Sequence, residues 1–207
     1  MGAVYRYMLY FRKDQLAEVL LGIAEMAEKH SPPTTIQFPD RIIEIPLESW
    51  ESEDRLLQHD DAELGFEIAM LFDLDESILE WGHGQKADDA FSPQTAQNVK
   101  PQVSVGYIYL TVYNDLKQYY PDITLDLKDL ALFEFSTTGT RMSIMFGSST
   151  SIRKRFLELM QRFDGVCGVF NNEENGEVFW LNGKEVHAVV DDPWTSPEEI
   201  ARRVSKG

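Results

Sequence analysis

The carboxylates that follow the apolar run at residues 66–72 are the first side chains whose spacing suggests chemistry. Asp73, Asp75 and Glu76 lie within four positions of one another, after a segment whose alternating apolar side chains predict a strand. Closely spaced carboxylate oxygens suit Mg²⁺, which prefers oxygen ligands. Asp73 and Asp75 are therefore candidate metal ligands, and the alternative is that they form the solvated end of a strand.

The sequence Asp73-Leu74-Asp75 resembles the opening Asp-x-Asp motif of the haloacid-dehalogenase-type phosphatases. The resemblance covers Asp73 and Asp75 only, and it implies Mg²⁺-dependent handling of a phosphate ester. The chain does not continue with the later Ser/Thr, Lys and paired Asp of that family in alternating strand and helix units. We therefore expect no resident cofactor.

A second unusual feature is a basic cluster at the start of a predicted helix, residues 150–163. Ser149 is a suitable N-cap, but Arg153, Lys154 and Arg155 occupy the first helical turn, where each unpaired cation opposes the helix dipole by roughly 0.3–1 kcal/mol. A phosphate or other anion at the free backbone N–H groups would explain the cations, and so would ion pairs with the acidic surface of the chain. The candidate anion-binding residues are Ser148, Ser149, Thr150, Arg153 and Arg155.

The sequence has no recognisable motif for nucleophilic or metal-assisted catalysis. No G-x-S-x-G motif occurs, and His59, His83 and His187 lack the helical spacing of a zinc site. Cys167 lies in a predicted buried strand, which favours an inert thiol. We assign no catalytic residue and expect a protein that is not an enzyme.

Tyrosines recur along residues 103–113, a further predicted strand. Tyr107, Tyr109 and Tyr113 fall on one face of it, and Tyr119 and Tyr120 follow. Tyrosine rings can stack on nucleic-acid bases. Because the chain is strongly acidic, contacts in the core or with a protein partner are the better interpretation.

The acidic charge is concentrated in residues 44–89. The whole chain of 207 residues has a formal net charge of −16, and these 46 residues carry 15 acidic side chains against only Arg55 and Lys86. Such a region opposes binding to nucleic acids and to anionic membranes and favours a basic protein partner, unless it serves only solubility. The candidate partner-binding residues are Glu51, Glu53, Asp54, Asp60, Asp61 and Glu63.

Composition and cysteine content limit the class further. With 43% hydrophobic residues the chain can bury a core, and with a single cysteine it cannot form an internal disulfide framework. No run approaches the roughly 18 apolar residues of a membrane span, and the first residues lack the pattern of a signal peptide. We expect a cytoplasmic globular protein.

Hydrophobic periodicity predicts alternating strands and helices. Residues 4–11 form a strand with Tyr5, Tyr7, Leu9 and Phe11 on one face, and a helix over residues 14–30 follows with Asp14 as its N-cap. The other predicted elements of the first half are strands at 34–38, 41–47 and 67–73 and a partly helical segment at 50–64.

In the second half, Asn182-Gly183 between residues 177–181 and 184–190 is the strongest hairpin signal. Ser196-Pro197-Glu198-Glu199 marks the start of the last helix. The remaining elements are strands at 103–113, 130–135, 141–146 and 166–170, with 130–135 and 141–146 expected to pair across a turn at 136–139.

These elements indicate an α+β fold of mixed or mostly antiparallel sheets covered by amphipathic helices. The expected domains are an N-terminal half at 1–81 that contains most of the acidic region, a linker or long loop at 82–102, and a C-terminal half at 103–207. Both halves contain an aromatic strand followed by an amphipathic helix, so an internal duplication is one hypothesis and chance resemblance is the other.

The function expected from these features is protein interaction through the acidic face, with an inhibitor or immunity-type role as one form of it. The alternative is a Mg²⁺-dependent protein that handles a phosphate ester or another small anion through Asp73, Asp75 and the basic helix start. A homodimer built through an exposed strand edge is a third possibility.

Overall fold

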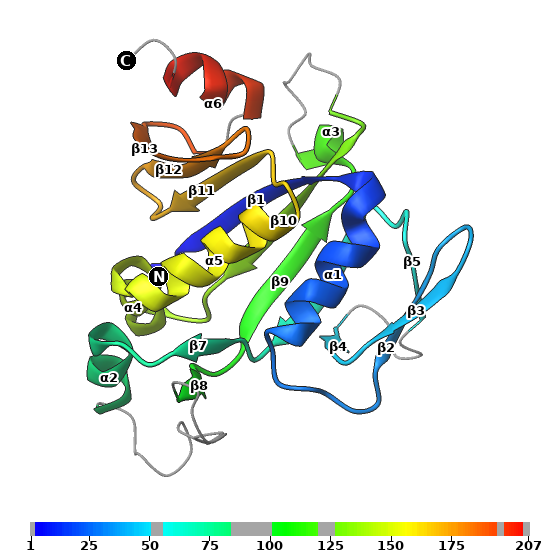
Figure 1. Cartoon of the computed structure of the whole chain (residues 1–207), viewed down its shortest axis with the longest axis horizontal. Helices are drawn as coiled ribbons and strands as arrows, with labels where there is room; N and C mark the ends of the chain where they lie inside the picture. The colour runs from blue at the N-terminus through cyan, green and yellow to red at the C-terminus, as the bar shows by residue number, and fades with distance from the viewer. Residues whose placement is uncertain (1–2, 51–55, 84–100, 120–126, 194–196, 205–207) are drawn as a thin grey trace.

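The computed structural model describes residues 3–50, 56–83, 101–119, 127–193 and 197–204, and it has an α+β fold with mostly antiparallel sheets (Figure 1). The main sheet has eight strands in the order β13-β12-β11-β1-β10-β9-β6-β4, and every neighbouring pair is antiparallel. The strands are β1 (Arg6–Arg12), β4 (Glu48–Ser49), β6 (Glu63–Ile68), β9 (Ile108–Tyr113), β10 (Leu130–Ser136), β11 (Cys167–Asn171), β12 (Gly176–Leu181) and β13 (Lys184–Val190).

Two smaller sheets stand beside the main one. One has the order β3-β2-β5, and the other pairs β7 with β8. Their strands are β2 (Thr34–Gln37), β3 (Ile42–Ile45), β5 (Leu56–Gln58), β7 (Leu71–Asp73) and β8 (Gln102–Ser104). The helices are the 3-10 helix η1 (Lys13–Gln15) and the α-helices α1 (Leu16–Glu25), α2 (Glu76–His83), α3 (Leu116–Tyr119), α4 (Thr140–Ser148), α5 (Thr150–Arg162) and α6 (Pro197–Val204).

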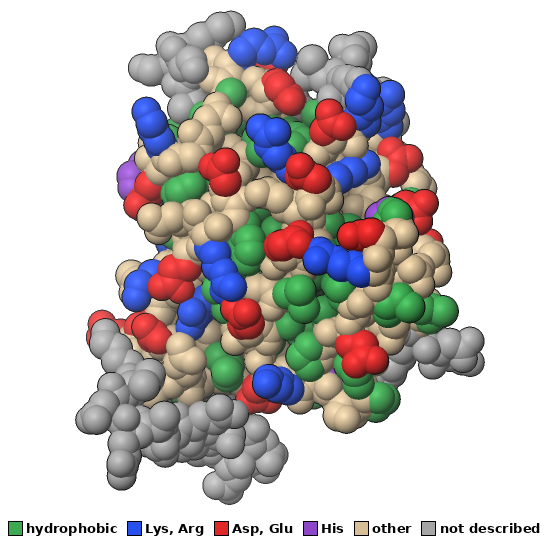
Figure 2. Space-filling model, turned by 45° about the vertical axis from the view of Figure 1, so that its right-hand side comes forward, with side chains coloured by type: hydrophobic (Ala, Val, Ile, Leu, Met, Phe, Trp, Pro, Cys, Tyr) green, Lys and Arg blue, Asp and Glu red, His purple; other side chains and the backbone are tan. Residues whose placement is uncertain are grey.

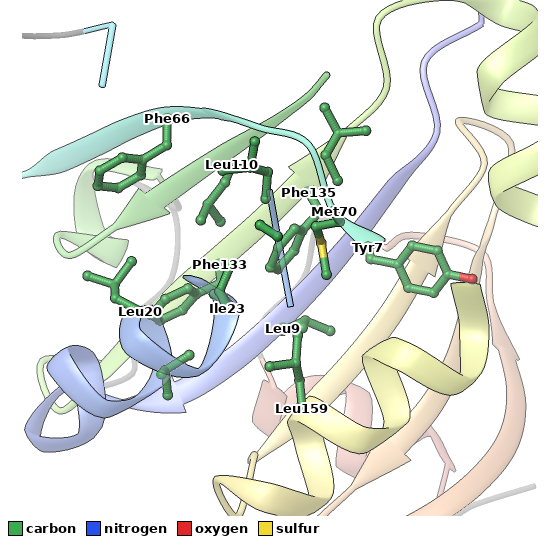
Figure 3. Close-up of a cluster of buried hydrophobic side chains, with 14 of the residues drawn as sticks. Tyr7, Leu9, Leu20, Ile23, Phe66, Met70, Leu110, Phe133, Phe135 and Leu159 are labelled. Carbon is green, nitrogen blue, oxygen red and sulfur yellow. The ribbon is translucent and has the colours of Figure 1, made fainter. Parts of the chain in front are cut away.

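One face of the main sheet carries the larger hydrophobic core. Because side chains alternate along a strand, Tyr7, Leu9 and Phe11 all point to this face, as the sequence predicts, and Tyr5 packs against the same cluster. Helices α1 and α5 lie side by side over this face (Figure 1). Figure 3 shows side chains from α1 and α5 close to those of the central strands, for example Leu20 near Phe133.

The opposite face carries a second, smaller core. Met8 and Tyr10 of β1 and Leu132 of β10 pack there with Leu116 of α3 and Ile200 of α6. The central strands are therefore buried on both faces, which explains the nearly continuous apolar sequences of β1 and β10.

Several local predictions are confirmed. Asn182 and Gly183 both have positive φ, 48° and 80°, in the turn between β12 and β13, as the favoured two-residue hairpin turn requires. Helix α5 begins after Ser149, whose hydroxyl accepts a hydrogen bond from the Ile152 N–H. The predicted strands at 34–38, 41–47 and 166–170 contain β2, β3 and most of β11.

The prediction of a strand at 141–146 is wrong, because these residues belong to helix α4. Met142, Met145 and Phe146 are buried at the i, i+3 and i+4 spacing of a helix. Short apolar runs fit both periods, and here β10 pairs with β1 and β9 instead of with this segment.

Other boundaries also differ from the predictions. The helix expected at 14–30 is η1 followed by α1, which ends at Glu25, and Asp14 lies inside η1 and is not an N-cap. The segment 67–73 divides between β6 and β7, because Met70 forms a bridge with Ala27 after the chain leaves the main sheet.

The segment 103–113 divides between β8 and β9, and Gly106 lies between them with a φ of 89°. The segment 50–64 contains β5 and the start of β6 where partial helix was expected, and residues 51–55 lie outside the described residues.

The two predicted halves contribute strands to one sheet. Strand β1 of the first half lies between β10 and β11 of the second, and β6 pairs with β9. Most of the predicted linker at 82–102 lies outside the described residues. The domain boundaries and the internal duplication stay predictions. None of the helices in the described residues is long and apolar enough to cross a membrane.

Candidate functional site

The basic start of α5 is occupied by a carboxylate from the same chain. Asp75, in the segment between β7 and α2, accepts hydrogen bonds on Oδ2 from the Ser149 hydroxyl at 2.7 Å and from the Ser151 N–H at 2.9 Å. The Thr150 hydroxyl donates to the same oxygen at 3.3 Å. These donors satisfy a carboxylate at the helix N-terminus, where negative charge is favoured.

The other oxygen of Asp75 caps a second helix. Oδ1 accepts a hydrogen bond from the Ile78 N–H at 3.0 Å, in the first turn of α2. Partial burial alone would raise the pKa of the Asp75 carboxyl, but the hydrogen bonds that it accepts outweigh burial and hold that pKa below its ordinary value. Asp75 therefore joins the N-termini of α2 and α5 in its ionised form.

The three cations that follow are also partnered within the chain. Arg153 pairs with Glu177 of β12, and its guanidinium lies 4.4 Å from the ring centroid of Phe179. Lys154 Nζ lies 3.9 Å from Asp73 and 3.6 Å from Glu158. Arg155 donates to the Leu71 carbonyl at 3.2 Å and to Glu158 at 3.0 Å.

The predicted anion-binding residues thus only partly converge. Ser149 and Thr150 meet at Asp75, whereas the Ser148 hydroxyl donates to the Met145 carbonyl in α4. Arg153 and Arg155 reach toward different partners. The alternative expectation was ion pairs with the acidic surface: Lys154 lies near Asp73 of that region, whereas Arg153 pairs with Glu177 and Arg155 with Glu158, both outside it. Binding of an external anion here stays a prediction, and Asp75 would compete with it.

The two predicted metal ligands make separate contacts. Asp73 accepts a hydrogen bond from the Gln102 amide at 3.3 Å and lies near Lys154, whereas Asp75 is turned to α5. Within the described residues, no group of three or more His, Cys, Asp or Glu side chains is placed to hold a metal ion. Metal binding by Asp73 and Asp75 stays a prediction.

The predicted partner-binding residues fall in two places. Asp60, Asp61 and Glu63 lie in the turn between β5 and β6 and at the start of β6, and all three are exposed. Asp61 accepts a hydrogen bond from the Gln58 N–H at 2.8 Å, and Asp60 lies 3.7 Å from His59. The others, Glu51, Glu53 and Asp54, lie outside the described residues.

An aromatic pair lies beside strand β6. The Trp50 ring meets Tyr109 of β9 edge to face, with 5.4 Å between centroids, and both side chains stay about 40% exposed, at 43% and 39%. The indole rests on Gly65 of β6, where any Cβ would collide with it. Strand register puts Glu67 between Glu48 and Tyr109. We call Trp50, Tyr109, Glu48, Glu63 and Glu67 the Trp50 patch.

The Trp50 patch lies on the sheet face opposite to α1 and α5. Leu64, Phe66 and Ile68 of β6 belong to the larger core, so the alternate residues Glu63, Gly65 and Glu67 point away from it. The sequence indicated the tyrosine face but not the indole that packs on it, because Trp50 reaches that face only through the pairing of β4 with β6.

A buried ion pair on the same face was missed by sequence reasoning. Glu134 of β10 accepts a hydrogen bond from the Tyr119 hydroxyl at 2.9 Å and lies 3.4 Å from Arg6 of β1. Burial raises the pKa of the Glu134 carboxyl, although Tyr119 and Arg6 both favour its ionised form. The only sequence signal was one acidic residue inside an apolar strand, and naming its partners required the strand register.

The remaining tyrosines and thiol have less distinctive surroundings. Tyr107 precedes β9 and is exposed, and the Tyr113 ring packs against Tyr119 with 4.3 Å between centroids. Burial and the charges of Glu134 and Glu63 raise the pKa of Tyr113 to about 12. Cys167 is buried in β11 as expected, and burial raises the pKa of its thiol.

No protein-family model, no curated protein and no solved structure matches this chain.

Proposed function

We propose that the chain is a non-enzymatic protein-interaction module that binds a basic protein through its acidic region, with an inhibitor or immunity-type role and a cytoplasmic location as the specific form. The observation that carries the proposal is the Trp50 patch, where two half-exposed aromatic rings are bordered by carboxylates. Aromatic side chains that are already held in place are frequent anchors of protein interfaces.

The packing of Trp50 makes it suitable as an anchor. Its ring is fixed between Gly65 and Tyr109 in the free protein, so a partner that covers the exposed side immobilises little additional side-chain freedom. Glu63 and Glu67 on the neighbouring strand supply charge at the border, where charges mainly increase the association rate and select the partner.

Other exposed apolar side chains belong to the same part of the chain. Ile42 of β3 is 60% exposed and Leu56 of β5 is 52% exposed, and both belong to the small sheet β3-β2-β5. Exposed apolar side chains within an acidic region of the chain are what a basic partner with apolar contacts would recognise. On the face in Figure 2, acidic and basic side chains are mixed, with apolar side chains between them.

The alternative of a Mg²⁺-dependent or anion-handling protein has less support. Asp75, which that function would need, already accepts four hydrogen bonds from α2 and α5. A homodimer through an exposed strand edge stays a separate proposal, tested by the molar mass in solution.

Selection of short random peptides displayed on phage tests the proposed function. The immobilised chain is expected to enrich peptides of net positive charge, and the corresponding synthetic peptides should bind at least tenfold more weakly at about 300 mM than at about 50 mM salt. Trp50→Ala and the double variant Glu63→Lys/Glu67→Lys should each weaken binding by about tenfold or more. Thermal melting of each variant establishes that it is folded.

A charge-matched control separates the patch from net charge. Glu173→Lys/Glu174→Lys makes the same change of charge in the exposed turn between β11 and β12 and should reduce binding less than threefold. Enrichment of peptides without positive charge would contradict the proposal. So would equal loss of binding in the control and in the patch variants.

A further inference from the structure

A cavity of about 660 Å³ opens at one end of the main sheet, and the rings of Trp50 and Tyr109 do not line it. One wall comes from the turns of the small sheet, at residues 38–41 and at His59, Asp60 and Ala62. The other comes from η1 and the start of α1, from residues 114–117 at the end of β9, and from residues 127–128. A volume of this size is typical of sites for small ligands.

Hydrogen bonds between these segments form the cavity before any ligand binds. The Asn114 amide donates to the His59 carbonyl at 3.1 Å and to the Asp61 carbonyl at 2.9 Å, and the Asn114 N–H donates to the Ala62 carbonyl. Lys13 N–H donates to the Asp129 carbonyl on the other wall. Because the walls are tied together, a ligand would bind without the cost of ordering them.

The floor of the cavity is apolar and one wall is aromatic. Leu16, Leu116 and Leu127 are almost completely buried beneath it. Phe38 and His59 lie together on the wall from the small sheet, with 5.2 Å between ring centroids. A flat or bulky apolar group would therefore find contacts on two sides.

The charges at the rim differ between the two walls. Lys13, Lys117 and Lys128 stand on the wall from the main sheet, and Asp40 and Asp60 stand on the opposite wall.

Three further charged residues line the cavity, and two of them are engaged within the chain. Arg41 pairs with Glu18, and the Asp115 carboxylate accepts hydrogen bonds from the first turn of α3. The third, Asp14, follows Lys13 directly in η1 and partly offsets its charge.

We propose that this cavity binds a short zwitterionic peptide, of roughly two to four residues, that carries an aromatic or large aliphatic side chain. The side chain packs on the apolar floor and against Phe38. The carboxylate of the peptide faces Lys13 and Lys117, and its ammonium group faces Asp40 and Asp60. This binding site is distinct from the Trp50 patch, because neither Trp50 nor Tyr109 lines the cavity, although it shares Asp60 with the acidic region.

Calorimetric titration of the full chain with the dipeptide Phe-Leu tests the proposal. The probes are Phe-Leu, its N-acetyl form, which lacks the ammonium group, and its C-terminal amide, which lacks the carboxylate. Each modification should weaken binding about tenfold, since one charged hydrogen bond is worth roughly that factor. Heat that does not saturate at about 10 mM Phe-Leu would overturn the proposal.

Variants of the two walls identify the orientation. Lys13→Ser/Lys117→Ser should weaken Phe-Leu about tenfold and leave the amide form unchanged, and Asp40→Asn/Asp60→Asn should weaken Phe-Leu about tenfold and leave the N-acetyl form unchanged. All four side chains are partly or fully exposed, so these variants should melt like the parent. Equal losses for all three probes in both variants would overturn the orientation and with it the proposal.

Two additional variants complete the test: one obstructs the cavity, and the other is a charge control. Ala62→Trp places a large side chain at the exposed lip of the cavity and should abolish the saturable heat. Lys184→Ser/Glu174→Gln removes one charge of each sign from exposed positions, on β13 and in the turn between β11 and β12, and should change the affinity less than twofold. Binding that survives Ala62→Trp would place the peptide elsewhere and overturn the assignment.

Discussion

Asp75 and Glu134 are two carboxylates that the fold removes from water in different ways. Asp75 accepts four hydrogen bonds at the N-termini of α2 and α5, and its pKa is lowered. Glu134 lies deeper in the sheet, with Tyr119 and Arg6 as partners, and its pKa is raised.

The opposite shifts follow from the depth of burial together with the number and kind of donors. Two backbone N–H groups and two hydroxyls point at Asp75 from helix starts, where the dipole adds to their effect. Glu134 is more deeply buried and has fewer donors, so desolvation is the larger contribution. Asp75 is therefore a structural contact at two helix starts, and the buried Glu134 on the sheet is kept at a cost in stability.

The largest effect is expected from Asp75→Ala. This change removes the cap of α2 and leaves the donors of α5 without their carboxylate, so the free energy of unfolding should fall by about 3 kcal/mol. Urea unfolding at neutral pH measures it. Asp60→Ala, at an exposed carboxylate in the same acidic region, should change it by less than about 0.5 kcal/mol. Equal losses in the two variants would contradict the role of Asp75.

A smaller loss is expected from Tyr119→Phe. Without the phenol hydroxyl, Glu134 loses a donor at 2.9 Å while it stays buried, so the protein should be destabilised by about 1–2 kcal/mol at neutral pH. Urea unfolding beside Tyr107→Phe, at an exposed ring before β9, provides the control. A change as small as that of Tyr107→Phe would mean that Arg6 alone satisfies the carboxylate.

The sequence predicted best those features that depend on neighbouring residues. The α5 helix, its Ser149 cap and the Asn182-Gly183 hairpin follow from local chemistry, and the structure contains them. The run at 141–146 was misread because six residues fit both a strand and a helix, and only the pairing of β10 with β1 and β9 decides between them.

The contacts at the candidate sites were also hard to predict, because they join residues that are far apart in the sequence. Three cations at a helix start indicated that negative charge must be near, but Asp75 lies 76 positions from Ser151, and nothing local could name it. Likewise, Glu134 and Arg6 meet only because β1 pairs with β10. The Trp50 patch depends on a two-residue strand, β4, which has no periodicity to detect.

The opposite pKa shifts predict opposite effects of pH. The stabilisation from Asp75 is present above its unfolded-state pKa and is lost as pH falls through the lowered folded-state pKa. The contribution of Glu134 is fully present below its unfolded-state pKa and is lost as pH rises through the raised folded-state pKa.

Glu134→Gln should therefore remove the loss of stability that the Glu134 carboxyl causes as pH rises. The glutamine keeps an acceptor for Tyr119. In the parent, the free energy of unfolding should fall as pH rises from about 4.5 to about 8, and in Glu134→Gln this fall should be smaller by on the order of 1 kcal/mol. Urea midpoints across this range measure the difference. Glu174→Gln in an exposed turn is the control, and an unchanged pH profile in Glu134→Gln would show that this carboxylate does not control it.

The smallest effect is expected from Lys154→Gln. Lys154 lies near Asp73 and Glu158, but its side chain is 65% exposed and the distances are 3.9 and 3.6 Å, so solvent and salt screen the attraction. The free energy of unfolding should change by less than about 0.5 kcal/mol, and the change should vanish at about 1 M salt. A loss approaching that of Asp75→Ala would mean that ion pairing, and not hydrogen bonding to helix starts, holds the acidic segment against α5.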